Sequence, residues 1–194
     1  MTRILVILTT LFTLHFSQAS FAQLSQEELR KILAPRIAGL LVLAKNGMLL
    51  SSVRAQNQKG MSLEQIQTID EEWKSGSSPL IDQLQQNKAG SFLKNIIVQQ
   101  ADVYSEVFLT DAQGANVAVF PATSDYWQGD EDKFTQSFAN GKGEVFIGEV
   151  EYDESSKTNA VQISVPMMYN NKAIGVMVIG VKVSVLEAEK LKGQ

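Results

Sequence analysis

The segment Thr123–Phe134, TSDYWQGDEDKF, holds the residues of this chain best suited to bind a small molecule. Tyr126 and Trp127 are adjacent aromatics that can form flat apolar walls, and the face of such a ring attracts a cation. Asp125 and Asp130 in the same segment and Asp153 further along would supply the counter-charge. Binding sites combine such apolar walls with a few placed polar groups. The sequence therefore predicts a non-covalent site for a small ligand, such as an amine or another cation.

Two other roles for these residues stay open. Trp127 would plug an edge of the sheet, and Asp130 would cap a short helix, if the segment were only structural. The carboxylates of Asp125, Asp130 and Asp132 raise the alternative of a metal site. Their spacing does not match that of a calcium-binding loop, so we expect no metal.

Histidine and cysteine, the residues of many catalytic and metal sites, are almost missing. His15 is the single histidine, and the chain has no cysteine. A chain that loses residues 1–22 therefore has neither imidazole nor thiol, which excludes Ser-His-Asp and Cys-His catalysis and the usual zinc ligand sets. A carboxylate pair of the glycosidase type stays open on composition alone, but the sequence indicates no substrate cleft. We expect no enzyme activity and no cofactor.

The start of the chain has the features of a secretory signal peptide. Arg3 supplies a positive charge, a short apolar run follows, and Ser20 and Ala22 are the small residues of a cleavage site. An uncleaved anchor is the alternative. After Ala22 no apolar run reaches the roughly 18 residues of a membrane span. We expect a signal peptide at 1–22 and a single domain at 23–194, located in the periplasm or secreted.

The charge of the chain is acidic and unevenly spread. The net charge is −4, yet residues 101–160 alone carry twelve acids against three lysines. An acidic half argues against a nucleic-acid surface. It suits a cationic ligand, although solvated acidic loops would have the same composition.

The first half of the chain has the 3.6-residue periodicity of helices. Ser25 and Glu28 form a capping-box pattern, and one apolar face runs on from there. We expect one long helix over 25–57, kinked or started late by Pro35. Its surface is a candidate for contact with a membrane signalling protein, with packing on its own domain as the alternative. Further helices are expected from Ser62 to Gly76, from Ser78 up to a break at Gly90, and over Phe92–Gln100.

From Tyr104 the apolar period changes to two, which indicates strands. Because the strands follow one another through short turns, we expect a five-stranded antiparallel sheet. One of these turns is the hairpin at Tyr169–Asn171, where Asn170 and Asn171 tolerate the left-handed conformation that tight hairpins need. The long N-terminal helix and the helical connection would pack on it in an α+β fold, with a pocket on the other face under residues 121–139. The expected elements are a strand from Tyr104 to Asp111, strands at Val117–Phe120, Glu144–Tyr152, Asn159–Met168 and Ala173–Val183, a short helix at Asp130–Ala139, and a short tail.

This order of elements resembles that of the single Cache (PDC) domains, which are PAS-like sensor domains outside the cytoplasm. The resemblance covers about residues 25–185 and is carried by VYSEVFLTDAQGANVAVF, TSDYWQGDEDKF, GKGEVFIGEVEYDESSKTNAVQISVPMM and NNKAIGVMVIGVKV. It implies a PAS-like sheet that senses small molecules such as amino acids, amines, carboxylates or purines. Positions that match the family's pockets imply ligand-binding roles for Tyr126, Trp127, Asp130, Lys133, Tyr152 and Asp153.

The resemblance also implies a role in signalling. Most family members are parts of kinases, chemoreceptors or diguanylate cyclases, but here no output domain follows before Gln194. We therefore expect action together with a separate membrane signalling protein. The arginine that grips the ligand's carboxylate in amino-acid-binding members has no match in this chain. An accessory interaction subunit with no ligand of its own is the alternative function.

Overall fold

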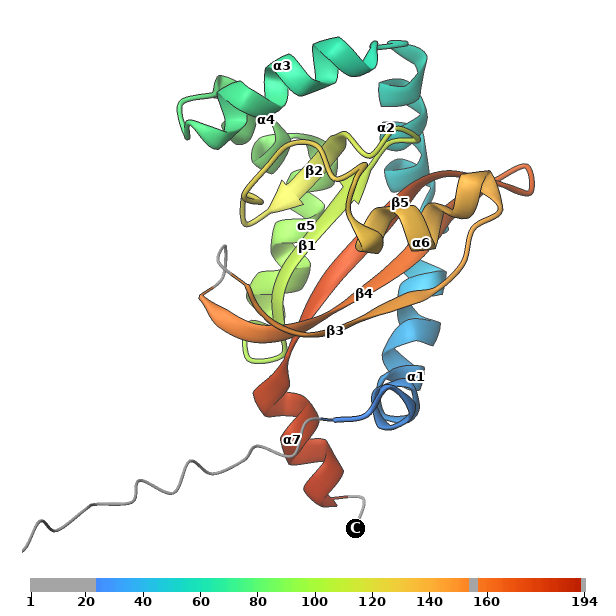
Figure 1. The fold of residues 1–194 in the computed structure, drawn as a ribbon, viewed down its shortest axis with the longest axis vertical. Coiled ribbons are helices and arrows are strands. Elements are labelled where there is room, and N and C mark those ends of the chain that lie inside the picture. Colours follow the sequence, from blue (N-terminus) through green and yellow to red (C-terminus); the bar gives the residue numbers. More distant parts are fainter. Residues whose placement is uncertain (1–23, 154–156, 193–194) are drawn as a thin grey trace, which may run out of the picture.

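The structure, a computed structural model, describes residues 24–153 and 157–192, so the predicted signal peptide at 1–22 lies outside the described residues. Within the described part, one open antiparallel sheet has the strand order β2-β1-β5-β4-β3 (Figure 1). This sheet with its helices is the PAS-like α+β fold expected from the sequence. The strands are β1 (Tyr104–Thr110), β2 (Asn116–Phe120), β3 (Phe146–Asp153), β4 (Thr158–Tyr169) and β5 (Lys172–Lys182).

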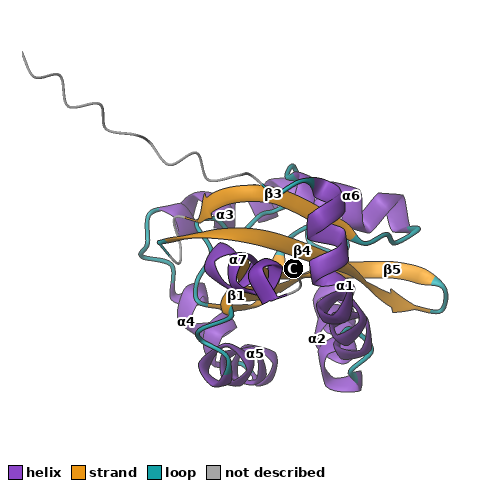
Figure 2. Ribbon diagram, turned by 90° about the horizontal axis from the view of Figure 1, so that it is seen from below, coloured by secondary structure: helices purple, strands orange, loops and turns teal. Residues whose placement is uncertain are grey.

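Helices cover both faces of the sheet, as the view from below shows (Figure 2). One face packs against α1, α2 and α5, and the other lies under α6. The helices are α1 (Gln26–Leu43), α2 (Gly47–Gln58), α3 (Leu63–Lys74), α4 (Pro79–Gln86), α5 (Lys88–Gln99), α6 (Asp132–Phe138) and α7 (Val183–Lys192).

The single helix predicted over 25–57 is wrong: α1 and α2 are separate and bent by 67°. Asn46 makes the break, because its side-chain oxygen accepts the N–H groups of Met48 and Leu49 at 3.0 and 3.3 Å and so caps α2. The apolar pattern hid the break, since both helices bury residues in the same core. In the described part of the chain no single helix is long and apolar enough to cross a membrane, and α1 with α2 meets that test only as a bent pair.

Capping residues also set the start of α1 and the break between α4 and α5. The capping box of Ser25 and Glu28 starts α1 as predicted, and Pro35 lies inside this helix. The break between α4 and α5 falls at Asn87 instead of Gly90. Asn87 ends α4 and starts α5, because its side-chain oxygen accepts the N–H of Gly90 at 2.8 Å.

The bounds of α6 and of the turn between β4 and β5 also depend on particular residues. The helix predicted at 130–139 is the shorter α6, whose N-cap position is Glu131, so Asp130 is not its cap. The turn between β4 and β5 has Asn170 and Asn171 at φ 49° and 61°, the left-handed conformation that Asn tolerates and that tight hairpins require. The hairpin predicted from these two residues is confirmed.

The end of the chain, predicted as a tail, forms the helix α7. Two ion pairs tie it to α1: Arg36 with Glu189, and Lys190 with Glu28, both at 2.7 Å. Its Leu186 is fully buried in the core shared with α1. The N-terminal and C-terminal helices are therefore held together beside the sheet (Figure 1).

Candidate functional site

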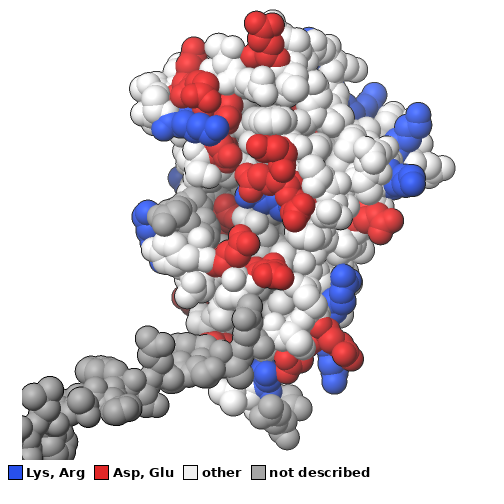
Figure 3. Space-filling model, viewed as in Figure 1, with Lys and Arg blue, Asp and Glu red and all other residues white. Residues whose placement is uncertain are grey.

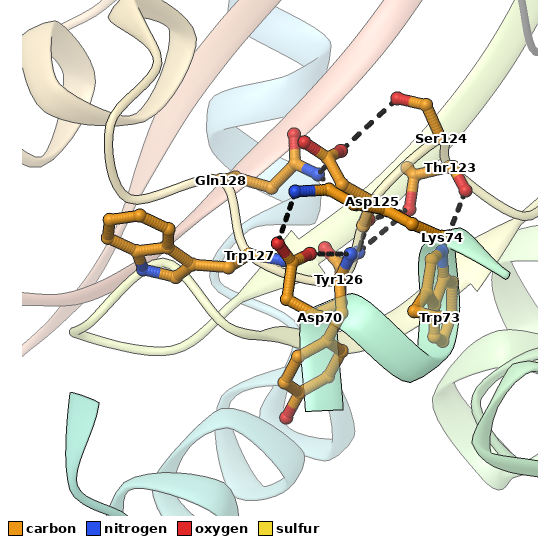
Figure 4. Close-up of polar contacts among 10 residues, drawn as sticks. Asp70, Trp73, Lys74, Thr123, Ser124, Asp125, Tyr126, Trp127 and Gln128 are labelled. Carbon is orange, nitrogen blue, oxygen red and sulfur yellow. Dashed lines mark hydrogen bonds and ion pairs between the residues drawn. The ribbon is translucent and has the colours of Figure 1, made fainter. Parts of the chain in front are cut away.

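The aromatic segment between β2 and α6 is held in place by α3. Asp70 on this helix is 4% exposed, and its Oδ1 accepts the backbone N–H groups of Tyr126 and Trp127 at 2.8 and 3.0 Å (Figure 4). Its other carboxylate oxygen pairs with the Nζ of Lys74 at 2.6 Å. One buried carboxylate thus fixes two consecutive peptide groups of the loop.

Tyr126 belongs to the core. Its side chain is 2% exposed, and its ring packs against Trp73 with 5.8 Å between ring centroids. Its hydroxyl accepts a hydrogen bond from Nε2 of Gln56 at 3.1 Å. Burial, with a smaller contribution from the charge of Asp111, raises the pKa of Tyr126 to about 12. The phenol is therefore a neutral, packed group that joins α2 and α3 to the sheet.

Trp127 points away from Tyr126 (Figure 4). Its indole N–H donates to the backbone oxygen of Gln113 at 2.8 Å, and its ring lies against Gly129. Because Tyr126 is buried in the core and Trp127 points away from it, the two rings do not face a common hollow. Neither residue lines the acidic pocket described next, and their roles in ligand binding stay predictions.

A hollow of about 1070 Å³, here called the acidic pocket, lies beside the start of α6 and the edge strand β3. It brings together Asp130, Lys133 and Tyr152, three of the residues predicted to bind ligand. Asp153 ends β3 opposite Thr158, and its role in ligand binding stays a prediction. The walls consist of Gln26, Arg30, Ser124, Asp130, Glu131, Asp132, Lys133, Phe146, Ile147, Gly148, Glu149, Glu151, Tyr152, Ala160 and Gln162.

The charge of the acidic pocket is dominated by carboxylates, with five acids and two bases in its walls. Figure 3 shows acidic side chains gathered on this face around a recessed basic group. The Nζ of Lys133 pairs with Glu131 at 2.7 Å and lies 5.8 Å from the ring centroid of Phe108. Burial raises the pKa of Glu131, and the charge of Lys133 opposes that rise. Because Lys133 is matched by Glu131, the other acids leave an excess of negative charge.

A partly buried hydrogen bond crosses the sheet at the wall of the pocket. Gln162 on β4 donates from Nε2 to Oε1 of Glu106 on β1 at 2.6 Å, although β5 lies between these strands. Both residues are in register with Gly180 of β5, whose missing side chain leaves the path open. Glu106 is 3% exposed, so this pair places a carboxylate inside the sheet.

Replacing Gly180 by alanine is expected to destabilise the fold by about 1–3 kcal/mol, the usual cost of overpacking. The added methyl group would collide with the hydroxyl of Ser105 and approach Cγ of Glu106 to 3.0 Å. Gly148→Ala is the matched control, because the nearest atom to its added methyl lies 3.5 Å away. Urea unfolding of the two variants measures the difference, and equal stabilities would contradict the close approach across β5.

The metal alternative is not supported by the geometry. The described residues contain no group of three or more His, Cys, Asp or Glu side chains placed to hold a metal ion. Asp125, one of the three carboxylates considered, instead accepts hydrogen bonds from Nε2 of Gln128 at 2.6 Å and from Ser124 at 3.2 Å. The Asp125 carboxylate therefore stabilises the loop to which it belongs.

Several pocket residues were not predicted. Gln26 and Arg30 come from the first turns of α1, and no local pattern links them to β3. Gln26 reaches the strand directly, because its Nε2 donates to the backbone oxygen of Gly148 at 3.3 Å. Gln162 could have been identified from the sequence, because it is a polar residue inside the apolar run of a strand that has neighbours on both sides.

No family model matches the chain, and no curated protein matches it. The solved structures that it resembles include the sensor domain of the histidine kinase DctB of V. cholerae, with a TM-score of 0.43 and 16% identity over 84% of this chain and 56% of that chain. They also include the sensory domain of the Campylobacter jejuni chemoreceptor Tlp3 with isoleucine bound, with a TM-score of 0.39 and 13% identity over 84% of this chain and 65% of that one.

A third similar structure is the ligand-binding domain of the Pseudomonas aeruginosa amino acid chemoreceptor PctC in complex with GABA, with a TM-score of 0.38 and 17% identity over 76% of this chain and 64% of that one. All three are sensor domains of the Cache type, the class that the sequence resembles. The chain spans less than two thirds of the length of each. At these TM-scores the similar structures do not indicate which ligand this chain binds. The class of ligand has to be inferred from the residues of this chain.

Proposed function

We propose that this protein is an exported, non-enzymatic sensor domain of the Cache type that binds a small amine or another small cation in the acidic pocket. It acts together with a separate membrane signalling protein. Export is supported by the charged, apolar and small-residue pattern of residues 1–22. The sensor role is supported by the resemblance of the sequence to Cache domains.

The observation that carries the choice of ligand is the set of groups in the acidic pocket. Asp130, Glu149 and Glu151 supply carboxylates beyond the Glu131–Lys133 pair. Tyr152 on β3 is 54% exposed and is a further lining residue of the same hollow. A cation gains from both kinds of group, because it is attracted by carboxylates and by the face of a Tyr ring. The volume, about 1070 Å³, is just above the range of roughly 300–1,000 Å³ typical of small-molecule sites.

Putrescine and choline are suitable first probes. Each is expected to raise the melting temperature of the protein, because a ligand that binds the folded state stabilises it by mass action. Glutarate, a small dianion, is the matched negative control. A shift with glutarate and none with either cation would contradict the proposed ligand class.

Variants locate the binding. Asp130→Asn and Glu151→Gln are each expected to reduce the cation-induced shift while leaving the fold intact, since both side chains are exposed. Asp82→Asn is the matched control, because Asp82 is an exposed acid on α4 that does not line the pocket. An equal loss in Asp82→Asn would show that the response comes from net charge and not from this pocket.

A further inference from the structure

A second hollow lies on the opposite face of the sheet, between α1 and α5. This apolar groove measures about 760 Å³ and has Ile32, Leu40 and Leu43 of α1 on one side and Phe92 and Ile96 of α5 on the other, with Ile179 of β5 at its base. Its size and its mainly apolar walls are those of small-molecule sites, which add a few converging polar groups.

The polar groups of the groove are concentrated at Arg36. Its guanidinium donates to both carboxylate oxygens of Glu189 at 2.7 Å, and Tyr104 is a further lining residue. Glu189, with Tyr104 as a lesser contributor, raises the pKa of Arg36, so the guanidinium stays charged. Such two-pronged pairing is the geometry with which arginine recognises carboxylates.

Arg36 and Glu189 differ in solvent exposure and in their positions along the chain. The Arg36 side chain is 16% exposed and comes from the middle of α1. The Glu189 side chain is 38% exposed and comes from α7, near the end of the described chain. Arg36 is thus the fixed cation of the groove, and Glu189 is the partner that another carboxylate can replace.

We propose that the apolar groove binds an amphiphilic carboxylate, which pairs with Arg36 in place of Glu189 and lays its apolar body between α1 and α5. Charge complementarity selects the anion. A cation would have to displace the more buried Arg36, and a neutral apolar molecule would gain nothing from the ion pair. This site is separate from the acidic pocket and does not depend on the proposed function.

Calorimetric titration with decanoate tests the proposal, with 1-decanol as a probe that has the same chain and no carboxylate. Decanoate is expected to bind and 1-decanol to bind more weakly, because only the carboxylate can replace Glu189 as the partner of Arg36. Absence of decanoate binding, or equal affinity for the alcohol, would overturn it.

Two charge variants are expected to act in opposite directions. Arg36→Ala removes the fixed cation and weakens decanoate binding about tenfold or more. Glu189→Gln removes the competing carboxylate and tightens it. A purely structural ion pair would not give opposite signs, so affinities that fall in both variants would refute the exchange.

Filling the groove gives a test that does not disturb the ion pair. Gly39 lines the groove, and a Cβ added there meets no atom within 4 Å, so Gly39→Leu is expected to fold normally, place its side chain in the groove and abolish decanoate binding. Gly47→Leu is the matched control, because Gly47 is equally open and lies outside the groove. Undiminished binding in Gly39→Leu, or an equal loss in Gly47→Leu, would overturn the assignment, and putrescine binding is expected to be unchanged in both.

Discussion

Replacing Tyr126 by alanine is expected to lower the free energy of unfolding by about 3–5 kcal/mol, the range for truncating a large buried aromatic. The ring is 2% exposed and packs against Trp73, so its removal leaves a cavity between α3 and the sheet. Urea unfolding followed by circular dichroism measures the change.

Two companion variants separate packing from hydrogen bonding. Tyr126→Phe removes the hydroxyl that accepts from Gln56 and is expected to cost about 1 kcal/mol, the usual net value of one hydrogen bond. Trp127→Ala is also expected to cost about 1 kcal/mol, since this ring is half-buried and lies over a turn. If Tyr126→Ala were as stable as Trp127→Ala, Tyr126 would not be a core residue. The prediction that both rings form the walls of a ligand site would then be favoured again.

Replacing Asp70 by alanine is expected to destabilise the fold by about 3 kcal/mol, because breaking a buried charged network leaves its partners unsatisfied. Two backbone N–H groups, those of Tyr126 and Trp127, lose the acceptor that holds the loop to α3 (Figure 4). Asp70→Asn keeps an oxygen at the same position and is expected to cost much less.

Lys74→Ala separates the loop contacts from the ion pair. Lys74 is half-exposed, so its pairing with Asp70 is screened by water and its loss is expected to have little effect on stability. Equal losses in Asp70→Ala and Lys74→Ala would show that the ion pair, and not the two backbone hydrogen bonds, is what holds the loop.

The sheet was predictable from the sequence because its signals are local. Alternating apolar residues identified the five strands, and Asn170 with Asn171 identified the hairpin between β4 and β5. The capping box of Ser25 and Glu28 identified the start of α1. The break at Asn46 was missed because the apolar period runs through it, and the cap that causes it is a single side chain.

The candidate site was predictable only in part. Asp130, Lys133 and Tyr152 were placed by resemblance and do line one pocket. Tyr126 was predicted to form a pocket wall because neighbouring Tyr and Trp side chains can bind a ligand together, yet its ring is buried against Trp73, a contact with a distant helix that the local sequence does not show. Arg30 could not be predicted, because it reaches the pocket through the packing of α1 beside β3, which is a long-range contact.

The central claim, that the acidic pocket binds a small cation, is tested most directly by calorimetric titration of putrescine into the wild-type protein and an Asp130→Asn, Glu151→Gln double variant. A saturable heat in the wild type and an affinity at least about tenfold lower in the double variant are expected, because a tenfold change corresponds to 1.4 kcal/mol, the scale of one charged contact. Equal affinity in the two proteins, or no heat with putrescine or choline, would contradict the claim.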